Sequence, residues 1–303
     1  MKTTMHSRVE SYLKQRRALG YELRIDGRML LNFARYADRS GHRGPLTREL
    51  ALHWAALPKT ASRLYWARRL EVVRIFARHQ VAIEPTTEIP PRHVFGPAHR
   101  RQTPHLYSAA QVRQLLVRAG RLSGRLRPLT YKTLLGLLAC TGLRISEALA
   151  LEVGNVDLEQ GCLLVHESKY HHRRWVPLHS TALAPLRRYD RHRRRLFPGA
   201  QHFFVSDRGR RFAYTTVRCV FRELAGGMKS TGARPLIRLH DLRHTFACRV
   251  LLRWQRSVRG AAGRMAILCR YLGHSRVTDT YWYLTATPKL LNEAARRGEP
   301  LGL

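Results

Sequence analysis

The chain has 303 residues, of which 55 are lysine or arginine and 20 are aspartate or glutamate, giving a formal net charge of +35 at pH 7. This length allows two domains of ordinary size, and the charge favours a polyanionic partner, with nucleic acid as the first candidate. The five cysteines are widely spaced, which argues against a secreted module stabilised by disulfides. No apolar run is long enough to span a bilayer, which argues against a membrane protein. A cytoplasmic protein is therefore expected.

Four segments with apolar residues at helical spacing come first in the chain. They cover residues 9–20, 28–41, 47–57 and 60–80. Glycine and proline residues separate them, and Thr47 stands where a helix N-cap is expected. Residues 1–84 are therefore predicted to form a small four-helix domain. Its arginine-rich polar faces suit contacts to a DNA backbone, or are simply solvated helix surfaces.

The rest of the chain is predicted to be a linker followed by a mixed domain. Residues 85–105 combine proline, glycine and basic residues without periodicity, as a linker does. Residues 106–303 are predicted to be mainly α-helical with a small antiparallel sheet. Helices are expected at 108–119, 131–142, 143–151 and 182–197, and from Thr215 onward. The stretches "CLLVHE" and "RRWVPL" are expected to pair as a hairpin, and "HFFVS" to form another short strand.

Several residues of the second domain suit phosphoryl transfer to a tyrosine. Two guanidinium groups, Arg144 and Arg243, can clamp the non-bridging oxygens of a phosphodiester through paired hydrogen bonds. A neutral phenol is a weak nucleophile, so His240 or His274 would help to remove its proton. The ammonium group of Lys169, in the hairpin turn, is a suitable acid for the leaving 5′ oxygen. Such a reaction requires no cofactor, no ATP and no metal ion.

Two motifs in this domain resemble those of the tyrosine recombinase, or phage integrase, family. The stretch "TGLRISEAL" is similar to the first family motif, with Arg144 at the catalytic arginine and Glu147 at the acidic position that supports it. The stretch "LHDLRHTFA" is similar to the second, with His240 and Arg243 at its H-x-x-R pair. The resemblance extends over residues 108–284 and identifies the domain as a member of that family.

The third motif, "YLGHS", places His274 at the family's His/Trp position, and the family tyrosine that follows it by nine residues is Tyr283. Tyr281 is the rival nucleophile. Two residues along a helix rotate a side chain by about 200°, so both tyrosines cannot face the same phosphate. The register with His274 therefore favours Tyr283.

Lys169 holds the place of the family's hairpin lysine, but its surroundings depart from the family pattern. "SKYHHRR" replaces the more usual glycine-rich turn and lacks a second lysine. The resemblance implies that Lys169 is the general acid. It stays open whether His171 or His172 shares that role with Lys169.

The resemblance implies an N-terminal core-binding (SAM-like) helical domain and a C-terminal catalytic domain. The implied activity is site-specific DNA recombination or integration through a 3′-phosphotyrosyl intermediate. The implied partners are double-stranded DNA and further copies of the chain, as a tetramer on two DNA sites, with an accessory recombinase or element-encoded protein as an additional candidate. Two alternatives stay open: DNA relaxation of the type IB topoisomerase kind, and a binding-only architectural DNA protein.

Overall fold

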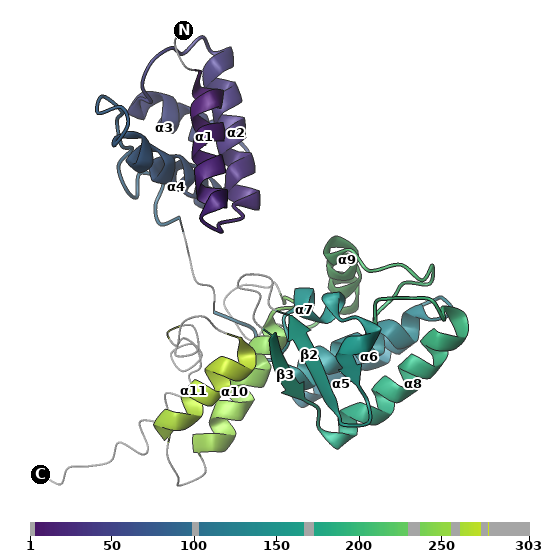
Figure 1. The fold of residues 1–303 in the computed structure, drawn as a ribbon. Helices are drawn as coiled ribbons and strands as arrows, with labels where there is room; N and C mark the ends of the chain where they lie inside the picture. The colour runs from purple at the N-terminus through teal and green to yellow at the C-terminus, as the bar shows by residue number, and fades with distance from the viewer. Residues whose placement is uncertain are drawn as a thin grey trace, which may run out of the picture. The chain divides into compact units, whose positions relative to one another are not determined.

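The computed structural model describes residues 4–98, 103–166, 173–229, 237–255, 261–273 and 278. Internal contacts divide the chain into two compact units, Met1–Gln102 and Thr103–Leu303. In Figure 1 the first unit is coloured purple to blue, and the second runs from teal through green to yellow. Each unit is described by itself below.

The described residues of the first unit form four α-helices, α1 (Met5–Ala18), α2 (Arg24–Arg39), α3 (Arg48–Ala56) and α4 (Arg63–Gln80). Three of these helices begin at a hydroxyl side chain, of Thr4, Thr47 or Ser62, that accepts a backbone N–H of the first turn. Such caps satisfy amide groups that a helix start leaves unpaired. The N-cap predicted at Thr47 is confirmed. The apolar faces meet around Phe33 and Phe76, which are fully buried.

Part of the segment expected to be a linker lies against this helical unit. The carboxylate of Glu88 accepts the backbone N–H of Arg48 at 2.6 Å. The ring of Phe95 packs edge-on against Trp66, with ring centroids 5.6 Å apart. The unit boundary accordingly falls after these contacts, at Gln102.

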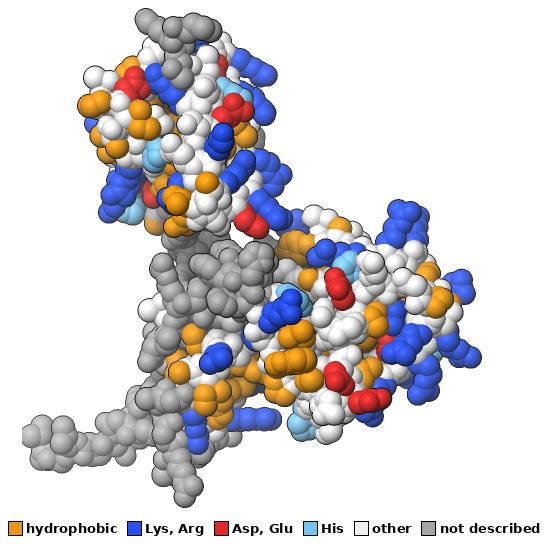
Figure 2. Space-filling model, in the orientation of Figure 1, with side chains coloured by type: hydrophobic (Ala, Val, Ile, Leu, Met, Phe, Trp, Pro, Cys, Tyr) orange, Lys and Arg blue, Asp and Glu red, His pale blue; other side chains and the backbone are white. Residues whose placement is uncertain are grey.

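The second unit is mainly α-helical with a small antiparallel sheet, as predicted. Its helices are α5 (Ala109–Gly120), α6 (Arg127–Thr141), α7 (Ile145–Ala150), the 3-10 helix η1 (Val153–Asn155), α8 (Ser180–Leu196), α9 (Tyr214–Leu224), α10 (Asp241–Gln255) and α11 (Ala261–Leu272). Lysine and arginine side chains, blue in Figure 2, are spread over its visible face. Among the helices described in either unit, none combines the length and apolarity that crossing a membrane requires.

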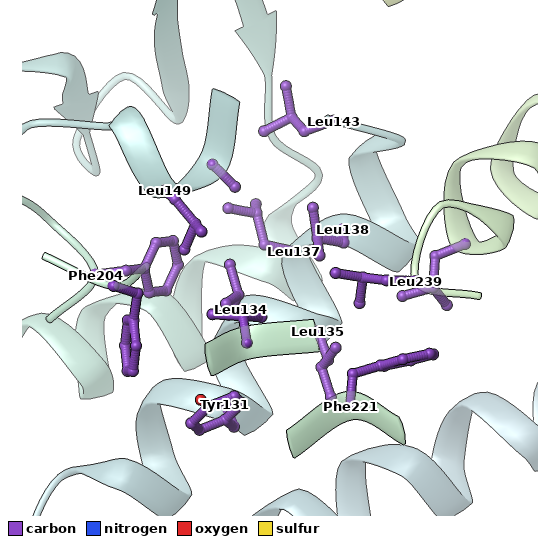
Figure 3. Close-up of a cluster of buried hydrophobic side chains, with 14 of the residues drawn as sticks. Tyr131, Leu134, Leu135, Leu137, Leu138, Leu143, Leu149, Phe204, Phe221 and Leu239 are labelled. Carbon is purple, nitrogen blue, oxygen red and sulfur yellow. The ribbon is translucent and has the colours of Figure 1, made fainter. Parts of the chain in front are cut away.

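Helix α6 lies at the centre of the second unit's core. Leu134, Leu135 and Leu137 project over nearly half of the circumference of this helix and are at most 3% exposed. Lys132 and Cys140 on the remaining side are exposed, so α6 is buried over most of its circumference, more than an amphipathic surface helix is. Figure 3 shows these side chains beside Phe221 of α9 and Leu239 of the segment before α10. Burial of each such side chain contributes roughly 1.5–3 kcal/mol.

The sheet has the order β1 (Val156–Asp157), β2 (Cys162–His166), β3 (Arg173–Pro177), and both pairs are antiparallel. Its side chains alternate between two faces, as strand geometry requires. Val165 and Val176 are buried on the inner face, whereas Trp175 is 61% exposed on the outer one. The predicted hairpin is confirmed, and its turn, residues 167–172, lies outside the described residues.

The prediction of a strand at "HFFVS" is wrong. The segment forms only isolated bridges, Glu152 with His202 and Val205 with Arg211, outside the strands of the sheet. Phe203 and Phe204 are both buried although they are adjacent, so the segment lacks the alternation of a one-sided strand. The third strand of the sheet is instead β1, which is too short to produce a periodic signal.

Gly142 ends α6 in a left-handed conformation, with φ of +65°. A Cβ added there would lie 2.5 Å from Cδ1 of Phe246. We expect Gly142→Ala to lower the free energy of unfolding by about 2–4 kcal/mol in urea denaturation, through backbone strain and overpacking. In the control Gly154→Ala, no heavy atom lies within 4 Å of the new Cβ. An equal loss in both variants would contradict this account.

Candidate active site

Arg144 and Glu147 form a closed pair at the start of helix α7. Arg144 is the N-cap residue, and Glu147 stands in the first turn. One carboxylate oxygen of Glu147 accepts the backbone N–H of Arg144 at 2.9 Å, and the other accepts Nη1 of the same arginine at 2.8 Å. The Arg144 side chain is 36% exposed, so part of its guanidinium reaches solvent. Glu147 therefore fixes the guanidinium group of Arg144 at the start of α7 and leaves part of it facing solvent.

A second arginine, Arg174 of strand β3, binds the same carboxylate. Its Nη1 and Nη2 donate to the two oxygens of Glu147 at 3.2 and 2.9 Å. The side chains of Arg174 and Glu147 are only 10% and 6% exposed. Burial by itself would raise the pKa of Glu147, but the hydrogen bonds and charges of Arg174 and Arg144 outweigh it and hold that pKa below its ordinary value. Glu147 is thus an anion shared by two arginines.

Arg243, on helix α10, is buried and bridges two chain segments. Its Nη1 donates to the carbonyl oxygen of Gly142 at 2.9 Å, and its Nη2 donates to that of Leu272 at 2.6 Å. The first contact fixes the arginine beside the turn that leads to Arg144. The second connects it to the end of helix α11.

Three successive carbonyl groups at the end of helix α11 each accept a hydrogen bond from a different arginine. Tyr271 O accepts from Arg174 Nε at 2.9 Å, Leu272 O from Arg243 Nη2 at 2.6 Å and Gly273 O from Arg144 Nη2 at 2.7 Å. The last carbonyls of a helix have no partner within it and carry the negative end of its dipole, so cations are favoured there. The result is a cluster of guanidinium groups, here called the arginine cluster, formed by Arg144, Arg174 and Arg243.

His240 precedes helix α10 close to the arginine cluster. Its ring meets that of His244 nearly at a right angle, with centroids 4.7 Å apart. Protein atoms around the imidazole, followed by the positive charge of Arg243, lower the pKa of His240 to about 4, although the side chain keeps an exposed edge. The ring is therefore neutral at pH 7 and able to accept a proton.

We expect His240 to stay neutral down to about pH 5, whereas an ordinary histidine titrates near pH 6.5. In an NMR titration of the DNA-free protein, its Cε1–H resonance should move only below that pH. Arg243→Gln should raise the midpoint, and the charge-retaining Arg243→Lys should not. Because the folded-state pKa lies below the unfolded one, this group makes the fold less stable as pH falls from about 6.5 toward 4. A native midpoint near 6.5 would contradict the expected environment.

The structure brings together four of the residues singled out from the sequence: Arg144, Glu147, His240 and Arg243. The others, Lys169, His274 and Tyr283, lie outside the described residues, as do the alternatives His171, His172 and Tyr281. The chain reaches His274 directly after Gly273, whose carbonyl binds Arg144. The described part of the site thus ends one residue before the third motif's histidine.

Tyr271 lies in the last turn of helix α11. It stacks on Phe246 with ring centroids 5.7 Å apart, and burial raises the pKa of Tyr271 to about 12. A phenol of that kind is fully protonated at neutral pH. These contacts suit a packing role for Tyr271 rather than a nucleophilic one.

Sequence reasoning missed Arg174. One signal was present, because Arg174 lies two residues before the inward-facing Val176 and therefore shares its face of the strand. An arginine at an inward position needs an anion within reach. Nothing in the local sequence, however, identified Glu147 as that anion.

The arginine cluster and the neutral His240 come from segments far apart in sequence, and guanidinium groups gathered in this way have the chemistry that suits a phosphate group. Residues 107–289 match the model of the phage integrase family. The chain belongs to this family, whose members named among its relatives are integrases and tyrosine recombinases, enzymes that break and rejoin DNA strands.

Individual relatives are similar to this chain over most of its length. The chain is 38% identical to a protein of Sinorhizobium fredii (strain NBRC 101917 / NGR234) named as an integrase/recombinase, y4rB, over 98% of both chains. It is 23% identical to tyrosine recombinase XerC of Leptospira interrogans, over 77% of this chain and 71% of that one. Its fold is similar to that of the Tn1549 transposon integrase in complex with transposon right end DNA, with a TM-score of 0.71 and 17% identity over 99% and 100% of the two chains.

Proposed function

We propose that this protein is a site-specific DNA recombinase or integrase that uses Tyr283 as its nucleophile. The observation that carries the proposal is the arginine cluster at the end of helix α11, because it collects guanidinium groups from three separate segments at the three residues directly before His274. Tyr283 follows in the same stretch of chain.

In the proposed reaction, Oη of Tyr283 attacks the scissile phosphorus and the bond from phosphorus to the 5′ oxygen breaks. Arg144 and Arg243 stabilise the negative charge on the non-bridging oxygens. Neutral His240, with His274, accepts the phenolic proton, which the low pKa of His240 permits at neutral pH. Lys169 donates a proton to the departing 5′ oxygen. The product is a 3′-phosphotyrosyl link and a free 5′ hydroxyl.

Rejoining is the reverse reaction with a 5′ hydroxyl from the partner duplex. The phosphotyrosyl bond keeps the phosphodiester's capacity for transfer, so neither ATP nor any other energy source is required. Glu147 and Arg174 take no proton in this scheme. They are positioning residues, since they hold Arg144 and the end of helix α11 in place.

The proposed partners are double-stranded DNA and further copies of the chain. A lambda integrase whose structure resembles this one, with a TM-score of 0.62, is described as a tetramer bound to a Holliday junction. A XerH recombinase with a TM-score of 0.64 is described in a post-cleavage complex with its difH substrate. We propose a tetramer on two DNA sites for this chain, with the four-helix unit, residues 1–84, taking part in DNA binding and residues 106–303 in catalysis.

The deciding experiment is to trap the protein on nicked or mismatched duplexes from a fragment library and to sequence the DNA that stays joined to it after denaturation. Recombination predicts one recurrent sequence with the protein on its 3′ end. Adducts spread over unrelated sequences, with supercoil relaxation, would favour a topoisomerase. The absence of any adduct would favour a binding-only protein.

A further inference from the structure

A second concentration of arginine lies in the catalytic unit away from the arginine cluster. It combines exposed arginines from the loop before α6, from the second half of α8 and from the turn at residues 206–211. We call it the arginine patch, and its members are Arg125, Arg191, Arg195, Arg208, Arg210 and Arg211. Figure 2 shows blue side chains gathered over the α8 side of this unit.

The three segments of the patch are held together by specific contacts. Oδ1 of Asp207 accepts the backbone N–H groups of Leu126 and Arg127 at 2.8 and 2.7 Å, which joins the turn to the loop before α6. On its other side, the turn places Gly209 against the ring of Phe197, the residue that ends α8. The patch therefore has a fixed shape within the unit.

The positive charge of the patch is not neutralised by nearby acids. Asp207 is engaged as the cap of α6, and Asp190 is buried between Arg193 and Arg194. Within the described part of the chain, none of the six patch arginines forms an ion pair. Arg191 and Arg195 are four residues apart on α8, where like charges destabilise a helix.

Helix dipoles explain only part of this arrangement. Arginines in the last turn of α8 are favoured by the negative end of its dipole, which accounts for Arg195. The same effect does not act on the loop arginine Arg125 or on Arg208 and Arg210 in the turn. A common anionic ligand accounts for all of them.

The patch and the proposed active site lie at opposite ends of helix α6. The N-terminal end of α6 is capped by Asp207, and Gly142 at its C-terminal end binds Arg243. A helix of 15 residues is about 20 Å long. Figure 1 likewise shows α8 on the side of the unit away from α10 and α11. The patch therefore lies well away from the phosphate that is proposed to bind at the arginine cluster.

We propose that the arginine patch binds the phosphate backbone of a second duplex segment, one that is not being cleaved. Guanidinium groups form paired hydrogen bonds with phosphate, and contacts of this kind carry no sequence information. The proposal rests on the proposed function only in that the ligand is DNA, since it requires no strand cleavage. The patch would thus hold a second duplex beside the one bound at the arginine cluster.

The test is a two-duplex capture assay with the full chain. A mixed-sequence duplex several turns long is tethered, protein is bound to it, and a labelled second duplex of the same sequence is added. The native protein should retain the second duplex. The triple variant Arg195→Gln, Arg208→Gln, Arg210→Gln should retain about tenfold less of the second duplex. The slope of log binding constant against log salt concentration should become shallower by about 2–3, because each phosphate contact contributes about 0.9 to that slope.

The matched control removes three exposed arginines of the catalytic unit that lie outside the patch: Arg113, Arg222 and Arg253. This control should capture the second duplex as the native protein does, and thermal melting should show that both triple variants are folded. Failure of the native protein to capture a second duplex, or equal losses in the two variants, would overturn the proposal. Covalent adducts measured on the same preparations test Tyr283 independently, so the two proposals fail separately.

Discussion

Replacement of Tyr283 by phenylalanine is expected to abolish the covalent DNA adduct while DNA binding persists. The variant lacks only the phenolic oxygen, so it removes the proposed nucleophile without changing the charge of the protein. Adduct formation is measured on denaturing gels with nicked duplexes, and binding by gel shift at the same protein concentration. Loss of detectable adduct corresponds to a fall of at least about 1000-fold, in line with removal of a nucleophile.

Tyr281→Phe is the matched control, because it makes the same chemical change two residues away on the same stretch of chain. It should form adduct at close to the native rate. The reverse result, with adduct lost only in Tyr281→Phe, would assign the nucleophile to Tyr281. It would also change the register between His274 and the tyrosine.

Replacement of Glu147 by alanine is expected to cost about 3–5 kcal/mol of unfolding free energy, measured by urea denaturation. The reason is that Arg174, 10% exposed, would keep its charge without the carboxylate that compensates it. The folded-state pKa of Glu147 is below its ordinary value, so this stabilisation is present above about pH 4.5 and is lost as pH falls below that value.

Glu147→Leu combined with Arg174→Met provides the control, since a buried ion pair replaced on both sides by apolar groups of similar size is often nearly neutral. The double variant should recover most of the stability that Glu147→Ala loses. Its rate of DNA cleavage should nevertheless be lower than that of the native protein, because Arg144 has lost the carboxylate that orients it. A double variant that is as unstable as the single one would show that the pair does not act through charge compensation.

Much of the fold could be predicted where a local cause is sufficient. The helix start at Thr47 follows from a hydroxyl N-cap, and the end of α6 follows from a glycine in the left-handed conformation. The Arg144–Glu147 pair is also local, since three residues separate its members on one helix turn. These features depend on interactions within a few residues, which sequence spacing represents directly.

Features that depend on tertiary packing could not be predicted in this way. Phe203 and Phe204 are buried on successive positions because surrounding elements cover both sides of the segment, so a strand was wrongly expected. Arg174 is held by Glu147 and by Tyr271 O, which are 27 and 97 residues away along the chain. Sequence periodicity contains no information about partners at such separations.

The shared anchoring at the end of helix α11 has a consequence for the fidelity of the enzyme. The carbonyl group of Gly273 is held by Arg144, one of the two arginines proposed to grip the phosphate, and Tyr283 follows Gly273 after ten residues, a span of at most about 35 Å when fully extended. In the proposed mechanism, a molecule in which the arginines have released the carbonyl groups of residues 271–273 loses two things: the arginines no longer support the phosphate, and the segment leading to Tyr283 no longer starts from a fixed position. On this mechanism we expect local unfolding at the end of helix α11 to stop DNA cleavage and not to release it from control.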